Sequence, residues 1–338
     1  MSAAPAMFNA PHLQVDYVEA TPEQLLAQDD TLAVFGFGED APHHDDPRYL
    51  RVALEPFGDR RLERWRASGP VTHGRDGDLA WSEDGSLQFG VIEIEEPEPL
   101  PGEATNGEIA RAAEYLYHKL IAFTAQHGYP QLLRIWNYLD GITLGQGDEE
   151  RYRVFCVGRA TGLGDFPIAR LPAATAIGRV DGARRLQVYW LASRTPGTPL
   201  ENPRQVSAYR YPRQYGPQSP SFARAMLPPQ SAAMPLLLSG TAAVVGHESK
   251  HADSVLAQLE ETLANFDSLI GAARQQRPGL ATAFGPDSCL KVYVRDVEDI
   301  ATVAAELDRR YGDRVPRILL HAAICRYELR VEIDGVHG

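Results

Sequence analysis

The chain has 338 residues, of which 44% are hydrophobic and 23% charged, a composition typical of globular proteins. Its formal net charge of −12 excludes a general nucleic-acid surface, because phosphate binding needs a clustered excess of lysine and arginine. No segment is long and apolar enough to cross a bilayer, and the start of the chain shows no export leader, so we expect no membrane partner. The three cysteines, Cys156, Cys289 and Cys325, are scattered and odd in number, which indicates reduced thiols in a cytoplasmic protein.

The first two hundred residues predict strands followed by a helix-containing unit. The segments DTLAVFGFGED and LAWSEDGSLQFGVIEIEE read as strands that complete the first sheet, and His43 and His44 fall in an exposed loop. Apolar residues at helical spacing predict a helix over 109–123, followed by the strand LLRIWNYL and a helix around RYRVFCVGRA. The strands PAATAIGRV and RRLQVYWLAS are expected to form a hairpin through the turn dipeptide Asp181-Gly182.

The last hundred residues repeat this order. A helix is predicted over 252–276, then the strand CLKVYVRDV, a helix over 300–311, and two strands over 317–326 and 329–334. We interpret the chain as α+β, with two diverged copies of one unit, each a mixed sheet covered by helices on one face. The expected divisions are an N-terminal unit (1–200), an arginine- and tyrosine-rich segment (201–235) and a C-terminal unit (236–338). The alternative is chance similarity between helix-strand-helix-hairpin segments.

The segment between the units is rich in arginine and contains no acid. From Asn202 to His247 there is no Asp or Glu, although the chain holds 45 of them. The segment carries four arginines and four aromatic residues: Arg204, Arg210, Arg213, Arg224, Tyr209, Tyr211, Tyr215 and Phe222. A solvated linker seldom carries so many aromatic residues, so the pattern favours an ordered loop that binds an anion.

The stretch VVGHESKHAD contains His-Glu-x-x-His, the spacing of a zinc-protease helix. Here the motif follows the strand-like GTAAVVG and precedes a helix whose apolar stripe begins only at Val255. Gly246 permits a bend, and Ser249 or Asp253 can cap the helix that follows. We therefore expect His247 and His251 not to share a helix face, and we predict no metal.

Alternation along the last two strands gathers a reactive set on one face of the sheet. In LRVEIDG, Glu332 points away from the apolar face, and a turn at Tyr327 and Glu328 would place Cys325 on the same side. The first unit has Gly178 and Tyr189 at the matching positions. The alternative is a surface carboxylate beside a small buried cysteine.

The second unit resembles the RidA/YjgF family in the segments QLEETLANFDSLI and VYVRDVEDIA and in the ending from Arg317 to RVEIDGV. The whole chain resembles the chorismatases, which join two such units. The segments YRYPRQYGPQSPSFARA, SGTAAVVGHES and CRYELRVEIDG carry this resemblance. It implies a site in a cleft beside the C-terminal unit, a monomer or a trimer, and chorismate as the substrate.

The resemblance also implies roles for particular residues. Chorismate carries two carboxylates and an enolpyruvyl ether, so we expect Arg224 and Arg317 to bind the carboxylates, since a guanidinium group can do so bidentately. We expect Tyr215, Tyr209 and Arg213 to add further contacts. Glu332 would protonate the terminal carbon of the enol ether, which requires that burial raise its pKa. No cofactor is implied.

Cys325 and Gly240 bear on the product. In the aromatising branch of the chorismatases a cysteine sits where Cys325 stands, opposite a glycine like Gly240, which we expect to leave room for the thiol. This combination favours release of pyruvate and 3-hydroxybenzoate, with 4-hydroxybenzoate as a conceivable second product. The alternatives are a hydrolytic chorismatase that yields a dihydroxycyclohexadiene carboxylate, a RidA-like imine deaminase, and a carboxylate-binding module without activity.

Overall fold

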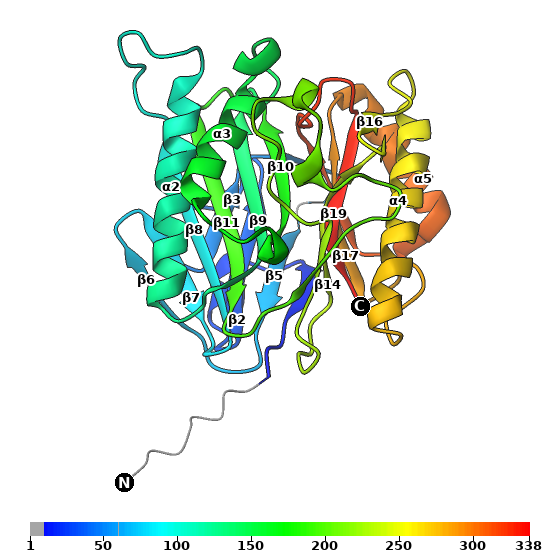
Figure 1. Ribbon diagram of the computed structural model, residues 1–338. Helices are drawn as coiled ribbons and strands as arrows, with labels where there is room; N and C mark the ends of the chain where they lie inside the picture. Colours follow the sequence, from blue (N-terminus) through cyan, green and yellow to red (C-terminus); the bar gives the residue numbers. More distant parts are fainter. Residues whose placement is uncertain (1–9, 60) are drawn as a thin grey trace.

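The structure is a computed structural model and describes residues 10–59 and 61–338. The expectation about an export leader falls partly on residues 1–9, which lie outside this range. Three large sheets meet at the centre, and the long helices lie outside the second and third sheets (Figure 1). The α+β class with helix-covered mixed sheets is thus confirmed. Within the described residues, no helix is long and apolar enough to span a membrane.

The first sheet was not predicted as a separate structure. Its four strands have the order β1-β5-β2-β3, and only one short helix accompanies them. The elements are β1 (Gln14–Val18), α1 (Pro22–Leu26), β2 (Thr31–Phe37), β3 (Tyr49–Val52) and β5 (Leu62–Arg66). The sequence predicted that the strands before residue 100 join the sheet that contains β9, β10 and β11. This is correct only for the strands after residue 71. Apolar alternation identifies strands but does not say which sheet they join.

The second sheet contains six strands in the order β10-β9-β11-β8-β7-β6. Helices α2 (Gly107–Gln126) and α3 (Arg151–Leu163) pack together and cover one face of it. The strands are β6 (Thr72–Asp76), β7 (Leu79–Glu83), β8 (Leu87–Glu95), β9 (Gln131–Asp140), β10 (Ala173–Arg179) and β11 (Arg185–Ser193). The apolar stripe over 109–123 is buried, as its spacing predicted.

The third sheet contains seven strands in the order β12-β13-β14-β19-β17-β18-β4. Helices α4 (Val255–Gln276) and α5 (Val297–Tyr311) cover its outer face. The strands are β4 (Glu55–Phe57), β12 (Thr198–Leu200), β13 (Ala225–Leu227), β14 (Leu236–Ala242), β17 (Ser288–Val294), β18 (Arg317–His321) and β19 (Val331–His337). Strands β12 and β13 anchor the two ends of the arginine-rich segment in this sheet, which fixes its position beside β14.

Both predicted hairpins are wrong. Strand β9 lies between β10 and β11, and β17 lies between β18 and β19. In each unit the inserted strand is parallel to one neighbour and antiparallel to the other. The turn dipeptide Asp181-Gly182 reverses the chain, but a turn does not decide which strands pair when a third strand is available to both.

The strand orders reveal three repeats where the sequence predicted two. The orders β1-β5-β2-β3, β8-β11-β9-β10 and β14-β19-β17-β18 are the same order of first, fourth, second and third strand. The directions also agree, because the second and third strands are parallel in each repeat and the other pairs are antiparallel. A shared core of residues from all three sheets joins the repeats. Only the second and third repeats carry long helices, so only they show the helical periodicity that sequence reasoning detects.

Candidate active site

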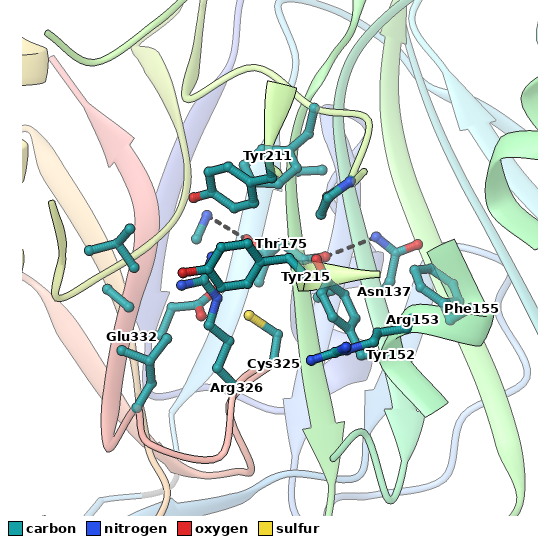
Figure 2. Close-up of a pocket in the computed structure, with 18 of the residues that line it drawn as sticks. Asn137, Tyr152, Arg153, Phe155, Thr175, Tyr211, Tyr215, Cys325, Arg326 and Glu332 are labelled. Atoms are coloured by element: carbon teal, nitrogen blue, oxygen red, sulfur yellow. Dashed lines mark hydrogen bonds between the residues drawn. The ribbon is translucent and has the colours of Figure 1, made fainter. Parts of the chain in front are cut away.

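A pocket lies at the junction of the second and third repeats (Figure 2). Strand β10 and helix α3 supply one wall, and β14 and β19 supply the other. The arginine- and tyrosine-rich segment and the loop over residues 325–329 complete the lining. Five of the predicted site residues line this pocket: Tyr215, Arg224, Gly240, Cys325 and Glu332. These residues come from two stretches of the sequence, 215–240 and 325–332, which the pairing of β14 with β19 brings together.

Glu332 is a buried carboxyl in the wall of the pocket. It lies on β19 and is 5% exposed, and no hydrogen bond or ion pair joins its side chain to another described residue. Burial and, after it, the negative charge of Asp334 raise the pKa of Glu332 to about 8, against the opposing charges of Arg134, Arg224 and Arg326. The group is therefore mostly protonated at neutral pH and can donate a proton to a bound molecule.

Gly240 makes room for this carboxyl. A Cβ atom at residue 240 would lie 1.9 Å from Oε1 of Glu332, far inside van der Waals contact. The sequence prediction assigned the space beside Gly240 to the thiol of Cys325, and the geometry corrects it. The absent side chain allows the Glu332 carboxyl to rest against the backbone of β14.

Cys325 supplies a neutral thiol to the same pocket. It lies in the loop after β18, which ends at His321, and not in a strand that extends to residue 326. Burial raises the pKa of the Cys325 thiol well above its usual value, and the nearby Glu332 contributes in the same direction. The thiol therefore remains protonated at neutral pH and is not a thiolate nucleophile. Figure 2 shows its sulfur on the same side of the pocket as Glu332.

Two buried arginines in the lining have N–H groups without partners among the described residues. Arg224, 4% exposed, donates from Nη2 to the carbonyl of Val206 at 2.9 Å and to the hydroxyl of Tyr211 at 2.7 Å, and its Nε has no partner. Arg159 on α3, also 4% exposed, has no partner at Nε or Nη2. A buried guanidinium group with unused donors is costly unless an anion satisfies it. The pair therefore fits a molecule with two carboxylates.

Three predicted binding residues lie outside this pocket. Arg317 begins β18, so the length of the strand separates it from Cys325. It donates to the carbonyls of Gly312 and Val315 at 2.9 Å each, and it forms an ion pair with Asp308. Its prediction as a carboxylate ligand is wrong, because strand alternation assigns a face but not a position along the strand.

Arg213 and Tyr209 are also placed elsewhere. Arg213 forms an ion pair with Asp148 at the surface, where its side chain is 65% exposed. Tyr209 contacts the guanidinium group of Arg210 in a separate groove, whose lining includes Ile168 and Pro199. In an irregular segment, neighbours in sequence point in different directions, and charge composition alone does not identify the residues that face a ligand.

Arg326 was missed by the sequence analysis although it lies in the quoted motif CRYELRVEIDG. Its guanidinium carbon lies 4.1 Å from the ring centre of Tyr215 and 5.0 Å from that of Tyr211. Its Nη1 donates to the carbonyl of His247 at 2.8 Å and to Oγ of Ser249 at 3.1 Å. These contacts join the arginine-rich segment to the terminal loop at the pocket (Figure 2). Arg159 was missed as well, because it reads as an ordinary helix residue.

The histidines of the zinc-like motif do not converge. His247 lies in the turn between β15 (Val244–Val245) and β16 (Glu248–Ser249), and its Nδ1 is 3.2 Å from the hydroxyl of Tyr215. His251 has a φ of 56° and pairs with Glu261 at 3.0 Å. The cap of α4 is Ser254, not Ser249 or Asp253. Among the residues that the structure describes, no group of three or more His, Cys, Asp or Glu side chains could hold a metal ion.

The pocket combines a buried carboxyl of raised pKa with buried guanidinium groups, an arrangement suited to binding a small carboxylic acid. Comparisons with known proteins agree. The profile of the family described as chorismatase FkbO/Hyg5-like, N-terminal, matches residues 63–192. A protein of Streptomyces rapamycinicus named chorismatase is 38% identical over 81% of this chain and 81% of its own length. A Streptomyces hygroscopicus protein named 3-hydroxybenzoate synthase is 33% identical over 87% of this chain and 86% of its own.

A crystal structure of a chorismatase superimposes with a TM-score of 0.81 at 34% identity. The match covers 98% of this chain and 99% of that one. The chain belongs to the chorismatase family.

Proposed function

We propose that this protein cleaves chorismate to pyruvate and 3-hydroxybenzoate. The observation that carries the proposal is the buried, neutral carboxyl of Glu332 in a pocket with two partially unpartnered arginines, Arg159 and Arg224. Chorismate requires this combination, because its two carboxylates need cationic partners and its enol ether needs a proton donor.

Glu332 would transfer its proton to the terminal CH₂ carbon of the enolpyruvyl group. That carbon becomes a methyl group, and the ether carbon becomes electron-deficient and open to attack by the ring hydroxyl of the substrate. The hydroxyl oxygen loses its proton as it bonds to the ether carbon, and its bond to the ring then breaks. The ether carbon releases the original ether oxygen to the ring, so pyruvate departs with the former hydroxyl oxygen as its ketone oxygen. The ring carbon that bears the original ether oxygen loses its proton and the ring becomes aromatic; of the two protons released, one protonates that oxygen and the other restores Glu332. The atoms of chorismate divide completely between pyruvate and hydroxybenzoate. No oxidant, reductant or second substrate is needed.

The buried arginines would hold the substrate in place for this transfer. Both donate charge-assisted hydrogen bonds, which are roughly twice as strong as neutral ones. A carboxylate that binds Arg224 also lies near the Glu332 carboxyl, since the charge of Arg224 acts on that group. Tyr215 and Arg326 would close the entrance above the bound substrate through the stacking contact that they make with each other.

The choice of 3-hydroxybenzoate depends on Cys325. The neutral thiol lies on the same side of the pocket as Glu332, where it excludes a water molecule and can guide proton transfer during ring opening. The relative named 3-hydroxybenzoate synthase supports this branch. Some 4-hydroxybenzoate would arise if the same intermediate collapses differently. A hydrolytic chorismatase is the second candidate, favoured by the relatives that carry only the name chorismatase.

Chromatography of chorismate incubated with the purified protein tests the proposal. We expect pyruvate and 3-hydroxybenzoate in equal amounts, in the presence of a chelator, and no aromatic product from Glu332→Gln. A dihydroxycyclohexadiene carboxylate would identify the hydrolytic branch. Turnover of iminopyruvate without turnover of chorismate would identify an imine deaminase. Binding of chorismate without any product would leave only a carboxylate-binding module.

A further inference from the structure

A buried polar network lies behind the catalytic wall, and the proposed mechanism does not use it. Its centre is Asp334, which is 0% exposed and lies two residues after Glu332 on β19. Oδ2 of Asp334 accepts hydrogen bonds from Thr175 at 2.7 Å, from Trp136 at 3.0 Å and from Tyr293 at 3.0 Å. The guanidinium group of Arg134, also 0% exposed, lies 3.2 Å from the same oxygen.

Thr175 connects this network to the pocket, whose lining it shares (Figure 2). Its hydroxyl donates to Asp334 and accepts from Arg134 and from the backbone N–H of Gly240, the last at 2.9 Å. One donor and two acceptor positions are thus all occupied. The carboxyl of Glu332 in turn lies against the backbone of Gly240, because its Oε1 is 1.9 Å from the position that a Cβ atom at residue 240 would occupy. A continuous chain of contacts therefore runs from the buried Asp334 to the catalytic acid.

We propose that Asp334 and Thr175 are positioning residues for Glu332. Asp334 favours the protonated form of Glu332 by placing a fixed negative charge behind it, and Thr175 fixes the position of the carboxyl through the backbone of Gly240. This inference depends on the proposed function in one respect, because it takes Glu332 as the proton donor.

The charges around Glu332 explain why such a device is needed. Arg224, which would bind the dianion, also stabilises the ionised form of Glu332 and so opposes its use as an acid, as do Arg134 and Arg326. Asp334 opposes the arginines. Four donors surround the Oδ2 of Asp334, whereas no donor among the described residues reaches the carboxyl of Glu332. Two carboxyl groups on one strand therefore lie in contrasting hydrogen-bond surroundings.

The experiment is the pH dependence of pyruvate release for two variants and their controls. Asp334→Asn removes the charge and keeps the shape, and Oδ1, where the amide would sit, has no partner to lose. We expect the pH at which activity falls to half to drop by one unit or more. Asp308→Asn removes a charge of the same sign far from the pocket and should leave this pH unchanged. An unchanged midpoint in a folded Asp334→Asn protein would overturn the electrostatic role.

The double variant Asp334→Asn, Arg134→Gln covers the case in which the single variant does not fold, because it removes the buried pair together. Asp334 affects the pKa of Glu332 more than Arg134 does, so the midpoint should still fall, by a smaller amount. A midpoint that rises or stays the same in a folded double variant would contradict the proposal.

Thr175→Val tests the positional role separately. We expect kcat to fall about tenfold or more, because small displacements of a catalytic group are costly. The pH midpoint and KM should stay close to the original values, and Thr175→Ser should restore the rate because it keeps the hydroxyl. An unaltered kcat in Thr175→Val would remove Thr175 from the proposal. Activity in Glu332→Gln would instead refute the proposed function, so the two failures can be told apart.

Discussion

Replacement of Glu332 by Gln should make the protein more stable while it abolishes catalysis. The folded state holds the pKa of Glu332 at about 8, above the ordinary value of 4.5, so folding favours the protonated form. The stability that this provides is complete below pH 4.5 and is lost progressively as the pH rises towards 8. Each pH unit in this window costs about 1.4 kcal/mol, so the wild type loses about 3 kcal/mol between pH 4.5 and pH 7.

Glutamine is neutral at every pH and does not suffer this loss. The free energy of unfolding of Glu332→Gln minus that of the wild type should therefore be about 3 kcal/mol larger at pH 7 than at pH 4.5, so the variant gains relative stability as the pH rises. Urea denaturation of both proteins at the two pH values measures this difference, and comparison across pH cancels the intrinsic preference for amide or acid. The rate of pyruvate release should fall by at least a hundredfold, the usual contribution of a general acid. A stability difference that is the same at both pH values would refute the assignment of a buried neutral carboxyl.

Three further predictions follow from the same geometry. Pyruvate release by the wild type should be nearly constant below pH 8 and fall tenfold per unit above it, since the acid is needed protonated; a rise through pH 8 would contradict this. Arg159→Gln should raise the KM for chorismate by about tenfold or more, as expected for the loss of a charged hydrogen bond. The surface control Arg213→Gln should leave KM unchanged, and equal effects of the two variants would contradict the role of Arg159 in binding. Gly240→Ala should lower the rate about tenfold or more with little change in Tm, because the Glu332 carboxyl can move away from the new methyl group; an unchanged rate would show that its position is not critical.

The sequence alone determined the class of the fold and named five residues that line the pocket. Helical periodicity identified the long helices because their buried stripes are continuous, and the acid-free stretch from Asn202 to His247 pointed to an anion. The motifs at the chain end named Glu332 and Cys325, and both line the pocket. These signals are local: each arises from residues that are close together in the sequence, so it can be read without the tertiary structure.

The tertiary structure decided what depends on pairing and direction. The insertion of β9 and β17 into the expected hairpins, and the third repeat without long helices, follow from which strands meet in space. The structure also places Arg159, and not Arg317, in the pocket beside Arg224. Strand alternation predicts which face of the sheet a side chain lies on, but it does not predict how far that side chain lies from a pocket. The raised pKa of Glu332 depends entirely on the tertiary structure. Burial and Asp334 raise this pKa and three arginines lower it, and these groups come from four segments that meet only in the folded chain.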